Sequence, residues 1–273
     1  MIKMKKREHY VPRMVLKNFC IEDEPGKCWE YNLHNKSFSK KRIEELCAQN
    51  YLYEIRDDKG DFFYDKGKNA VENGFGQLES EFTPFLDTLI NRLEYENTLT
   101  ISNNDLELLY TWISFLLIRN PIIFHALPFA AKEIGINIEN KLSKSYSFIE
   151  VMPYLLERFT NDLKNGHIEF YKAVNEFNFV MSDIPIIIKE FPLHHYCYYP
   201  LSSRFAMAIK KPVTVVTDIH KCNVKMLNNY EVMKRNYMMF DALMNSYESD
   251  LAFGNSLIAN NEIVLRQMIL PGV

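Results

Sequence analysis

Two stretches in the middle of the chain show the apolar spacing of three and four residues that is typical of amphipathic helices. The first runs from Asn69 to about Leu93, and Pro84 inside it should kink or divide the helix. The second begins at Ser102, whose spacing to Asp105 forms a capping box, and ends near Asn120-Pro121. These are the two longest elements that the pattern predicts.

Two more helical regions are predicted from Ile122 to about Leu142, interrupted at Pro128, and from Phe148 to Leu163. Beyond Gly166 the pattern changes to short β-branched or aromatic runs that are typical of strands. The predicted strands are His167–Val174, Asn178–Met181, Ile184–Ile188, Tyr196–Tyr199 and Arg204–Ile209. A final helix over Val224–Met244 and a closing strand over Ile263–Leu270 complete this half.

The N-terminal part is predicted to consist of hairpins and short helices. Val11 precedes a proline and should be extended, whereas Pro12 suits the first turn of a helix that runs to Phe19. The following elements are a hairpin of Lys27–Leu33 with Lys36–Lys40, a short helix over Arg42–Gln49, and a hairpin of Tyr51–Ile55 with Asp61–Tyr64. The expected fold is therefore α+β.

We expect one domain over residues 1–273, because no Gly/Ser linker or low-complexity tract divides the chain. Its subdivisions would be a hairpin region (1–66), a helical region (67–165) and a strand-rich region (166–273). With 273 residues, 47% of them hydrophobic, the chain can bury a large core.

Composition excludes several classes of function. No P-loop and no Gly-x-Gly-x-x-Gly motif occurs, so nucleotide-cofactor binding of those types is disfavoured. With 32 basic against 35 acidic side chains, no global field attracts nucleic acid, although a local basic groove stays open. The chain lacks a signal-peptide pattern and an apolar run long enough to cross a membrane, so we expect a soluble, cytoplasmic protein without a membrane partner.

The cysteines and histidines do not match a standard zinc site. Five cysteines form no Cys-x-x-Cys pair and are interpreted as reduced structural thiols. A zinc site could be suggested by four residues, His194, His195, Cys197 and His220. Adjacent histidines on an extended segment point to opposite faces, however, so the cluster is interpreted as incidental.

The opening His9-Tyr10-Val11-Pro12-Arg13 is the strongest candidate for chemistry. His9 and Arg13 would flank the start of a helix, where unpaired backbone N–H groups favour a phosphate or carboxylate. His9 could also transfer a proton near neutral pH. The alternative is structural: His9 would bond a backbone carbonyl, and Arg13 would pair with a carboxylate at the edge of the core.

Two carboxylates are further candidates, as catalytic groups or as ligands of a divalent ion such as Mg²⁺ or Mn²⁺. Glu79 lies beside an apolar helical stripe, with Glu72 on about the same face, but it could equally pair with Arg119 or Arg13. Asp183 follows a predicted strand in Ser182-Asp183-Ile184-Pro185 and could orient His9, or else close a turn.

A second turn could supply hydroxyl groups and a guanidinium. Ser202 and Arg204, in Pro200-Leu201-Ser202-Ser203-Arg204, could bind an oxyanion together with Ser182, although a turn into the next strand explains them as well. No Gly-x-Ser-x-Gly elbow is present, so a serine hydrolase of the α/β type is not supported.

These motifs together resemble the bacterial domain-of-unknown-function family 4238 over nearly the whole chain. The matching segments are His9 to Arg13, Leu16-Lys17-Asn18-Phe19, Trp29-Glu30-Tyr31, Asn50-Tyr51-Leu52-Tyr53, Leu78-Glu79-Ser80-Glu81, Arg119-Asn120-Pro121, Met181-Ser182-Asp183-Ile184-Pro185 and Pro200-Leu201-Ser202-Ser203. Two departures are the lack of a tryptophan near Phe170 and Tyr171, and the pair Asn228-Asn229 where one Asn is usual. The resemblance implies positions to test and no reaction.

Two functions follow from these residues. In the first, the protein is a hydrolase of a phosphate-containing small molecule or nucleic acid, of nuclease or phosphodiesterase type. His9 is then the acid or base, Arg13 and Arg119 neutralise charge, and Glu79 and Asp183 bind a metal or orient the base. In the second, the same residues form a non-catalytic anion- or ligand-binding module or only stabilise the fold. Solvent-accessible convergence of these groups favours the first, and buried, fully paired groups favour the second.

Overall fold

The computed structural model describes residues 7–54, 70–121, 144–164, 166–189, 196–210, 221–248 and 255–270. These residues form an α+β structure, as the sequence predicts, with two larger sheets and a short strand pair. The helices are α1 (Arg13–Leu16), the 3₁₀ helix η1 (Lys17–Phe19), α2 (Ala70–Tyr95), α3 (Asn103–Arg119), α5 (Lys144–Leu163), α6 (Asn229–Glu248) and α7 (Glu262–Ile269).

The six-stranded sheet is antiparallel except where β11 runs parallel to β6. Its strands, in spatial order, are β5 (Thr98–Thr100), β11 (Lys221–Leu227), β6 (His167–Ala173), β10 (Phe205–Lys210), β9 (Tyr196–Pro200) and β8 (Ile187–Lys189). The four-stranded sheet has the order β3 (Ser37–Arg42), β2 (Lys27–Asn32), β12 (Ser256–Ala259) and β7 (Met181–Ser182). In the short pair, β1 (Arg7–His9) lies antiparallel to β4 (Ala48–Asn50).

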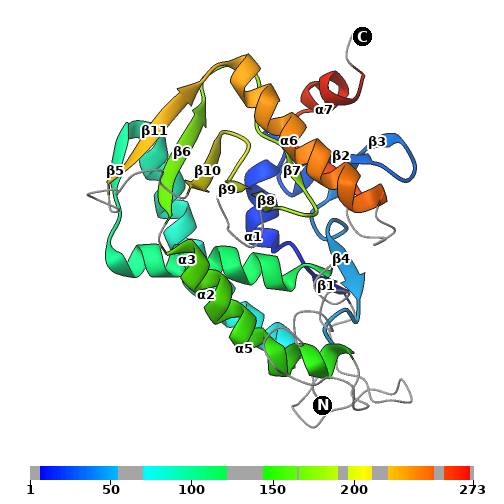
Figure 1. Cartoon of the computed structure of the whole chain (residues 1–273). Helices are drawn as coiled ribbons and strands as arrows, with labels where there is room; N and C mark the ends of the chain where they lie inside the picture. The colour runs from blue at the N-terminus through cyan, green and yellow to red at the C-terminus, as the bar shows by residue number, and fades with distance from the viewer. Residues whose placement is uncertain are drawn as a thin grey trace.

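Alternating side chains place the six-stranded sheet between two apolar cores. On one face, Phe170 and Met207 pack with the core that contains α1, α2, α3 and α5. On the other face, Tyr171 and Ala208 pack with α6 and α7. Figure 1 shows α2, α3 and α5 together and α6 on the other side of the strands. The helical middle of the chain therefore covers one face of the sheet.

The two long helices follow the apolar spacing closely. Ser102 caps α3 by accepting the Asp105 amide at 3.2 Å, as the capping box predicts. Trp112 of α3 is fully buried and stacks on Phe82 of α2, with ring centroids 4.1 Å apart. Burying a large apolar side chain stabilises the fold by about 1.5–3 kcal/mol. Pro84 lies inside α2 and does not divide it.

Four sequence predictions of secondary structure are wrong. In the predicted strand Tyr51–Ile55, the described residues 51–54 form a turn and a bend. The segment predicted as a helix over Arg42–Gln49 is a turn that leads into β4. The start of the predicted Val224–Met244 helix is strand β11, and α6 begins only at Asn229, after Asn228 and Glu231 exchange a capping box. The predicted closing strand Ile263–Leu270 is helix α7.

Other elements follow the prediction. The hairpin of β2 and β3 forms at the predicted place, and the opening helix reaches Phe19 with its last turn as η1. The helical region 122–142 and most of the second hairpin lie outside the described residues. In the part of the chain that is described, no helix combines the length and the apolar character needed to span a bilayer.

Candidate functional site

Arg119, the last residue of α3, is buried and joins three elements through its guanidinium. Its Nε donates to the backbone carbonyl of His9 at 2.7 Å, where β1 ends. Its two terminal nitrogens contact carboxylates of α2, with Nη1 donating to Glu79 and Nη2 lying 3.4 Å from Glu72 Oε2. The Phe75 ring lies 4.8 Å from the guanidinium carbon. Removing one partner of such a buried pair is strongly destabilising, because the other charge stays buried.

Tyr53 also links this cluster to β1. Its hydroxyl donates to the backbone carbonyl of Arg119 at 2.5 Å, and its amide donates to Glu8 Oε2 at 2.7 Å. Both Tyr53 and Glu8 are buried. Strand β1 and Tyr53, which follows β4, are thus both hydrogen-bonded to Arg119 at the end of α3.

Asp183 lies at the turn after β7 and forms a second buried cluster beside the first. Its Oδ2 accepts the amide of Asn255 at 2.8 Å and the hydroxyl of Tyr10 at 3.4 Å. Its backbone carbonyl accepts Asn120 Nδ2 at 3.3 Å. Its Oδ1 is buried and accepts no hydrogen bond from the described part of the chain. Burial raises the pKa of this carboxyl to about 6, although the Asn255 amide opposes the shift.

The predicted serine residues close turns. Ser202 Oγ accepts the amides of Arg204 (3.2 Å) and Phe205 (3.0 Å). Ser182 Oγ donates to the carbonyl of Ile184 at 2.7 Å and accepts its amide at 3.2 Å. Arg204 is half-exposed and pairs with Glu94 at 3.2 Å. These contacts correspond to the structural alternative for each residue.

Asn18 connects the opening segment to the Pro200–Ser203 turn. Its amide Nδ2 donates to the carbonyl of Leu201 at 3.3 Å, and its own carbonyl accepts the Ser203 amide at 3.0 Å. Together with the Tyr10–Asp183 and Arg119–His9 contacts, this link brings most of the motifs found in the sequence into one hydrogen-bonded region.

A pocket of about 380 Å³ opens beside the Arg119 cluster, and we call it the arginine pocket. It is lined by Arg7, His9, Arg13, Glu44, Glu72, Gly76, Glu79 and Arg119. Four predicted site residues, His9, Arg13, Glu79 and Arg119, therefore share one pocket. Asp183, Ser182, Ser202 and Arg204 do not line it.

His9 is held in the arginine pocket by its Nε2, which lies 3.3 Å from the carbonyl of Ile43. Because a carbonyl only accepts hydrogen bonds, Nε2 carries the proton and Nδ1 carries the lone pair. Burial lowers the pKa of His9 to about 4, and the positive charges of Arg13, Arg119 and Arg7 add to the shift. The ring is therefore neutral at physiological pH.

Arg13 and Arg119 differ in how their charges are balanced. Arg13 is exposed, and its guanidinium makes no hydrogen bond or ion pair to any residue that the structure describes. Helix α1, which it begins, has only four residues. A helix this short has only a small dipole, so the predicted contribution of its N-terminus to an anion site is small.

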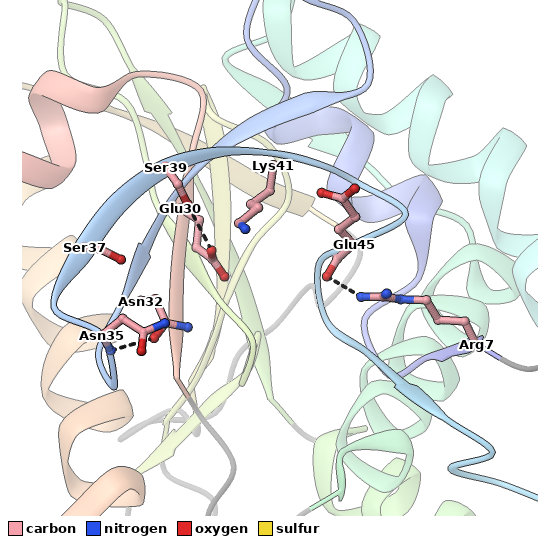
Figure 2. Close-up of a pocket in the computed structure, with 8 residues that line it drawn as sticks. All are labelled: Arg7, Glu30, Asn32, Asn35, Ser37, Ser39, Lys41 and Glu45. Atoms are coloured by element: carbon pink, nitrogen blue, oxygen red, sulfur yellow. Dashed lines mark hydrogen bonds between the residues drawn. The ribbon is translucent and has the colours of Figure 1, made fainter.

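A second, polar pocket of about 440 Å³ lies over the β2–β3 hairpin (Figure 2). Glu30 is buried at its base and accepts the hydroxyls of Ser256 (2.6 Å) and Ser39 (3.4 Å). Arg7 lines both pockets and donates to the carbonyl of Glu45 at 2.7 Å. The lining side chains in Figure 2 are polar or charged, with no aromatic ring among them.

The two predicted metal ligands are not brought together. Glu79 is paired with Arg119 in the arginine pocket, whereas Asp183 is buried against Tyr10 and Asn255. Within the described ranges, no group of three or more His, Cys, Asp or Glu side chains could hold a metal ion. His194, His195 and His220 lie outside these ranges.

Sequence reasoning missed Glu8, Tyr53 and Asn18 as members of this region. Glu8 is fully buried, whereas its neighbours Arg7 and His9 are not. Because alternate residues of a strand face opposite sides, a strand prediction for Arg7–His9 would have placed Glu8 on the other face from its neighbours. Tyr53 and Asn18 lie in segments that carry the family resemblance, but the sequence assigns neither a role, because their partners, the carbonyls of Arg119 and Leu201, are distant in sequence.

Comparisons with known proteins give a family and no activity. No curated protein and no solved structure matches the chain. One family model, described as a protein of unknown function (DUF4238), matches residues 7–242. This range includes β1, the Arg119 cluster, Asp183 and the arginine pocket. Because the match covers most of the sequence, the chain belongs to the DUF4238 family.

Proposed function

We propose that the arginine pocket binds a small anionic ligand carrying a phosphate or a carboxylate, with Arg13 as the recognition residue. The single observation that carries this proposal is the contrast between the two arginines. The Nε, Nη1 and Nη2 atoms of Arg119 each have a hydrogen-bond partner. The guanidinium of Arg13 lines the same pocket and has no partner among the described residues. An arginine fork matches the oxygens of either anion.

The rest of the pocket supports this assignment. Arg7 adds a second exposed cation, and neutral His9 adds a ring nitrogen without adding charge. The carboxylates Glu72 and Glu79 are neutralised in part by Arg119, so their repulsion of an anion is reduced. Glu44 stays as an exposed negative group at the pocket, which favours a ligand of limited charge.

The test is calorimetric titration of the protein with inorganic phosphate and pyrophosphate. We expect saturable binding that weakens at least tenfold in Arg13→Ala, because a charge-assisted hydrogen bond contributes about 1.5–3 kcal/mol. The matched control is Arg266→Ala on α7, since Arg266 is also exposed and lies outside the arginine pocket, where it pairs with Glu262 and packs over the Phe38 ring. Equal affinities of the two variants, or no binding to the wild-type protein at millimolar anion, would exclude the proposal.

Phosphoester hydrolysis is a second candidate function, favoured by the state of His9. A neutral imidazole whose Nε2–H is fixed by Ile43 offers Nδ1 as a base toward an attacking water. A bound phosphate would offset the repulsion from the three arginines, which is a smaller cause of the lowered pKa than burial, and would raise the pKa of His9 in part. Ile43 then supplies the orienting contact that the sequence assigned to Asp183.

For this candidate we expect the wild-type protein to hydrolyse bis(p-nitrophenyl) phosphate, tested with and without Mg²⁺ or Mn²⁺. His9→Ala should lower kcat/KM by at least about 100-fold, the usual contribution of a general base. His34→Ala, at an exposed position of the β2–β3 turn, is the matched control. If turnover by His9→Ala equals that of His34→Ala, His9 has no catalytic role and the pocket is a binding site only.

A further inference from the structure

The chain reverses direction between η1 and β2, and this reversal places Cys20 opposite Cys28. The amide of Ile21 donates to the carbonyl of Lys27 at 2.8 Å. Cys20, just before Ile21, and Cys28, just after Lys27, therefore lie next to this bond on facing arms of the turn. Gly26 permits the turn with a φ of 83°. Facing residues of antiparallel arms have Cα atoms about 4.5–5.5 Å apart, a separation that a disulfide can span. The two sulfur atoms are 3.9 Å apart.

The two thiols differ in exposure and in protonation. Cys28 is fully buried, whereas Cys20 is partly exposed to solvent. The Cys28 thiol donates toward the Cys20 sulfur, and this bond lowers the pKa of Cys20 to about 7. The same bond, with burial, raises the pKa of Cys28. The accessible sulfur is therefore the better nucleophile and the buried sulfur keeps its proton.

We propose that Cys20 and Cys28 form a dithiol site that hydroperoxides oxidise reversibly to a disulfide. In the first step the Cys20 thiolate attacks one oxygen of ROOH, the O–O bond breaks, and the leaving alkoxide takes a proton to give ROH and Cys20–SOH. In the second step the Cys28 sulfur attacks the Cys20 sulfur, the S–O bond breaks, and water leaves with the thiol proton. The two thiols lose two electrons and two protons, and a dithiol reductant reverses the change.

The disulfide would act on the opening segment. In the reduced protein both thiols lie near the carbonyl of Leu16, the last residue of α1, at 3.8 and 3.7 Å. Oxidation removes the thiol hydrogen that Cys28 directs at Cys20 and links the residue after η1 covalently to β2. Asn18, which binds Leu201, lies two residues before Cys20. This inference does not depend on the proposed ligand of the arginine pocket.

The test uses the reduced full-length protein and hydrogen peroxide, followed by catalase, alkylation in denaturant and tryptic mass spectrometry. Trypsin separates the two cysteines at Lys27, so a disulfide appears as two linked peptides that dithiothreitol releases. We expect this linkage while Cys197 and Cys222, both buried, stay alkylatable. In Cys28→Ser, dimedone should trap a sulfenic acid at Cys20, and Cys20→Ser should slow the oxidation of Cys28 at least tenfold.

Cys197→Ser, which changes a buried thiol in β9, is the control and should keep the linked peptides. The wild-type measurement is decisive by itself if a variant does not fold. The proposal is overturned if Cys20 and Cys28 remain free thiols, if Cys20 is oxidised beyond the sulfenic acid without linkage, or if the linkage forms only in urea.

Discussion

Replacing Arg119 by methionine should lower the free energy of unfolding by about 3–5 kcal/mol, the range observed when one partner of a buried ion pair is removed. The variant would leave Glu72 buried without its cation and the carbonyl of His9 without its 2.7 Å donor. Glu79, also a partner, would lose its pairing in the arginine pocket. Urea denaturation followed by circular dichroism measures the change.

The matched control for this prediction is Arg92→Met on α2. Arg92 also contacts a carboxylate, Glu96, four residues later, and donates to the Thr100 carbonyl, but its side chain is 35% exposed, so the ion pair is far less buried than that of Arg119. Such pairs contribute about 0.3–0.5 kcal/mol. If Arg119→Met costs as little as Arg92→Met, Arg119 does not stabilise the junction of β1, α2 and α3. Arg119→Lys should not restore stability, because an ammonium group cannot reproduce three directed contacts.

The second large effect is on the pH dependence of stability, where His9 and Asp183 act in opposite directions. His9 has a pKa of about 4 in the folded protein against 6.5 when unfolded, so the unfolded state binds its proton first and stability falls as the pH drops from 6.5 to 4. Asp183 has a pKa of about 6 against 3.8, so the folded state binds its proton first. That contribution grows as the pH drops from 6 to 3.8.

Each contribution amounts to about 2 kcal/mol between pH 7 and pH 4.5, so the two nearly cancel in the wild-type protein. Relative to wild type, His9→Gln should gain about 2 kcal/mol of stability over this range, and Asp183→Asn should lose a similar amount. The measurement is the free energy of unfolding in urea at pH 7, 6, 5 and 4.5. Curves for both variants that run parallel to the wild-type curve would show that neither group titrates as described.

The sequence predicts well those parts of the fold that depend on local pattern. The capping box of Ser102 and Asp105 and the spacing of Phe82 and its neighbours specify α2 and α3, because these helices bury one face over many turns. Of the two effects predicted for Pro84, a kink or a division of the helix, division does not occur, because α2 is continuous from Ala70 to Tyr95. The β2–β3 hairpin likewise depends on its own turn.

The errors occur where a partner distant in sequence decides the structure. Residues 221–227 form β11 because they pair with β6 and β5, which no local pattern reveals. The error over 262–269 has a local cause instead, because the segment carries a helix signal: Asn261 caps it by accepting the Ile263 amide, and the buried Val264, Leu265 and Met268 have helical spacing. Residues 43–47 form a turn because the strand that follows them, β4, pairs with β1.

For the candidate site, too, the sequence indicates which residues are of interest but not how they are paired. The structure brings His9, Arg13, Glu79 and Arg119 to one pocket, whereas Asp183, which the sequence suggested could orient His9, lies outside it. Their roles could not be assigned from the sequence, since pairing and burial are properties of the folded chain. The contacts match the structural alternatives for six candidates, whereas Arg13 has no partner among the described residues. These six are His9, which contacts the Ile43 carbonyl, and Glu79, Arg119, Asp183, Ser182 and Ser202.

Strand β12 joins the last part of the chain to its beginning, because it lies between β2 and β7 in the four-stranded sheet. During synthesis on the ribosome, the β2–β3 hairpin emerges more than 200 residues before β12. Until then, the edge of β2 that pairs with β12 has no partner strand. A recombinant fragment cut at residue 242, where the family match ends, would lack that neighbour permanently. Expression boundaries for this protein should therefore extend past α7 and not follow the limits of the family model.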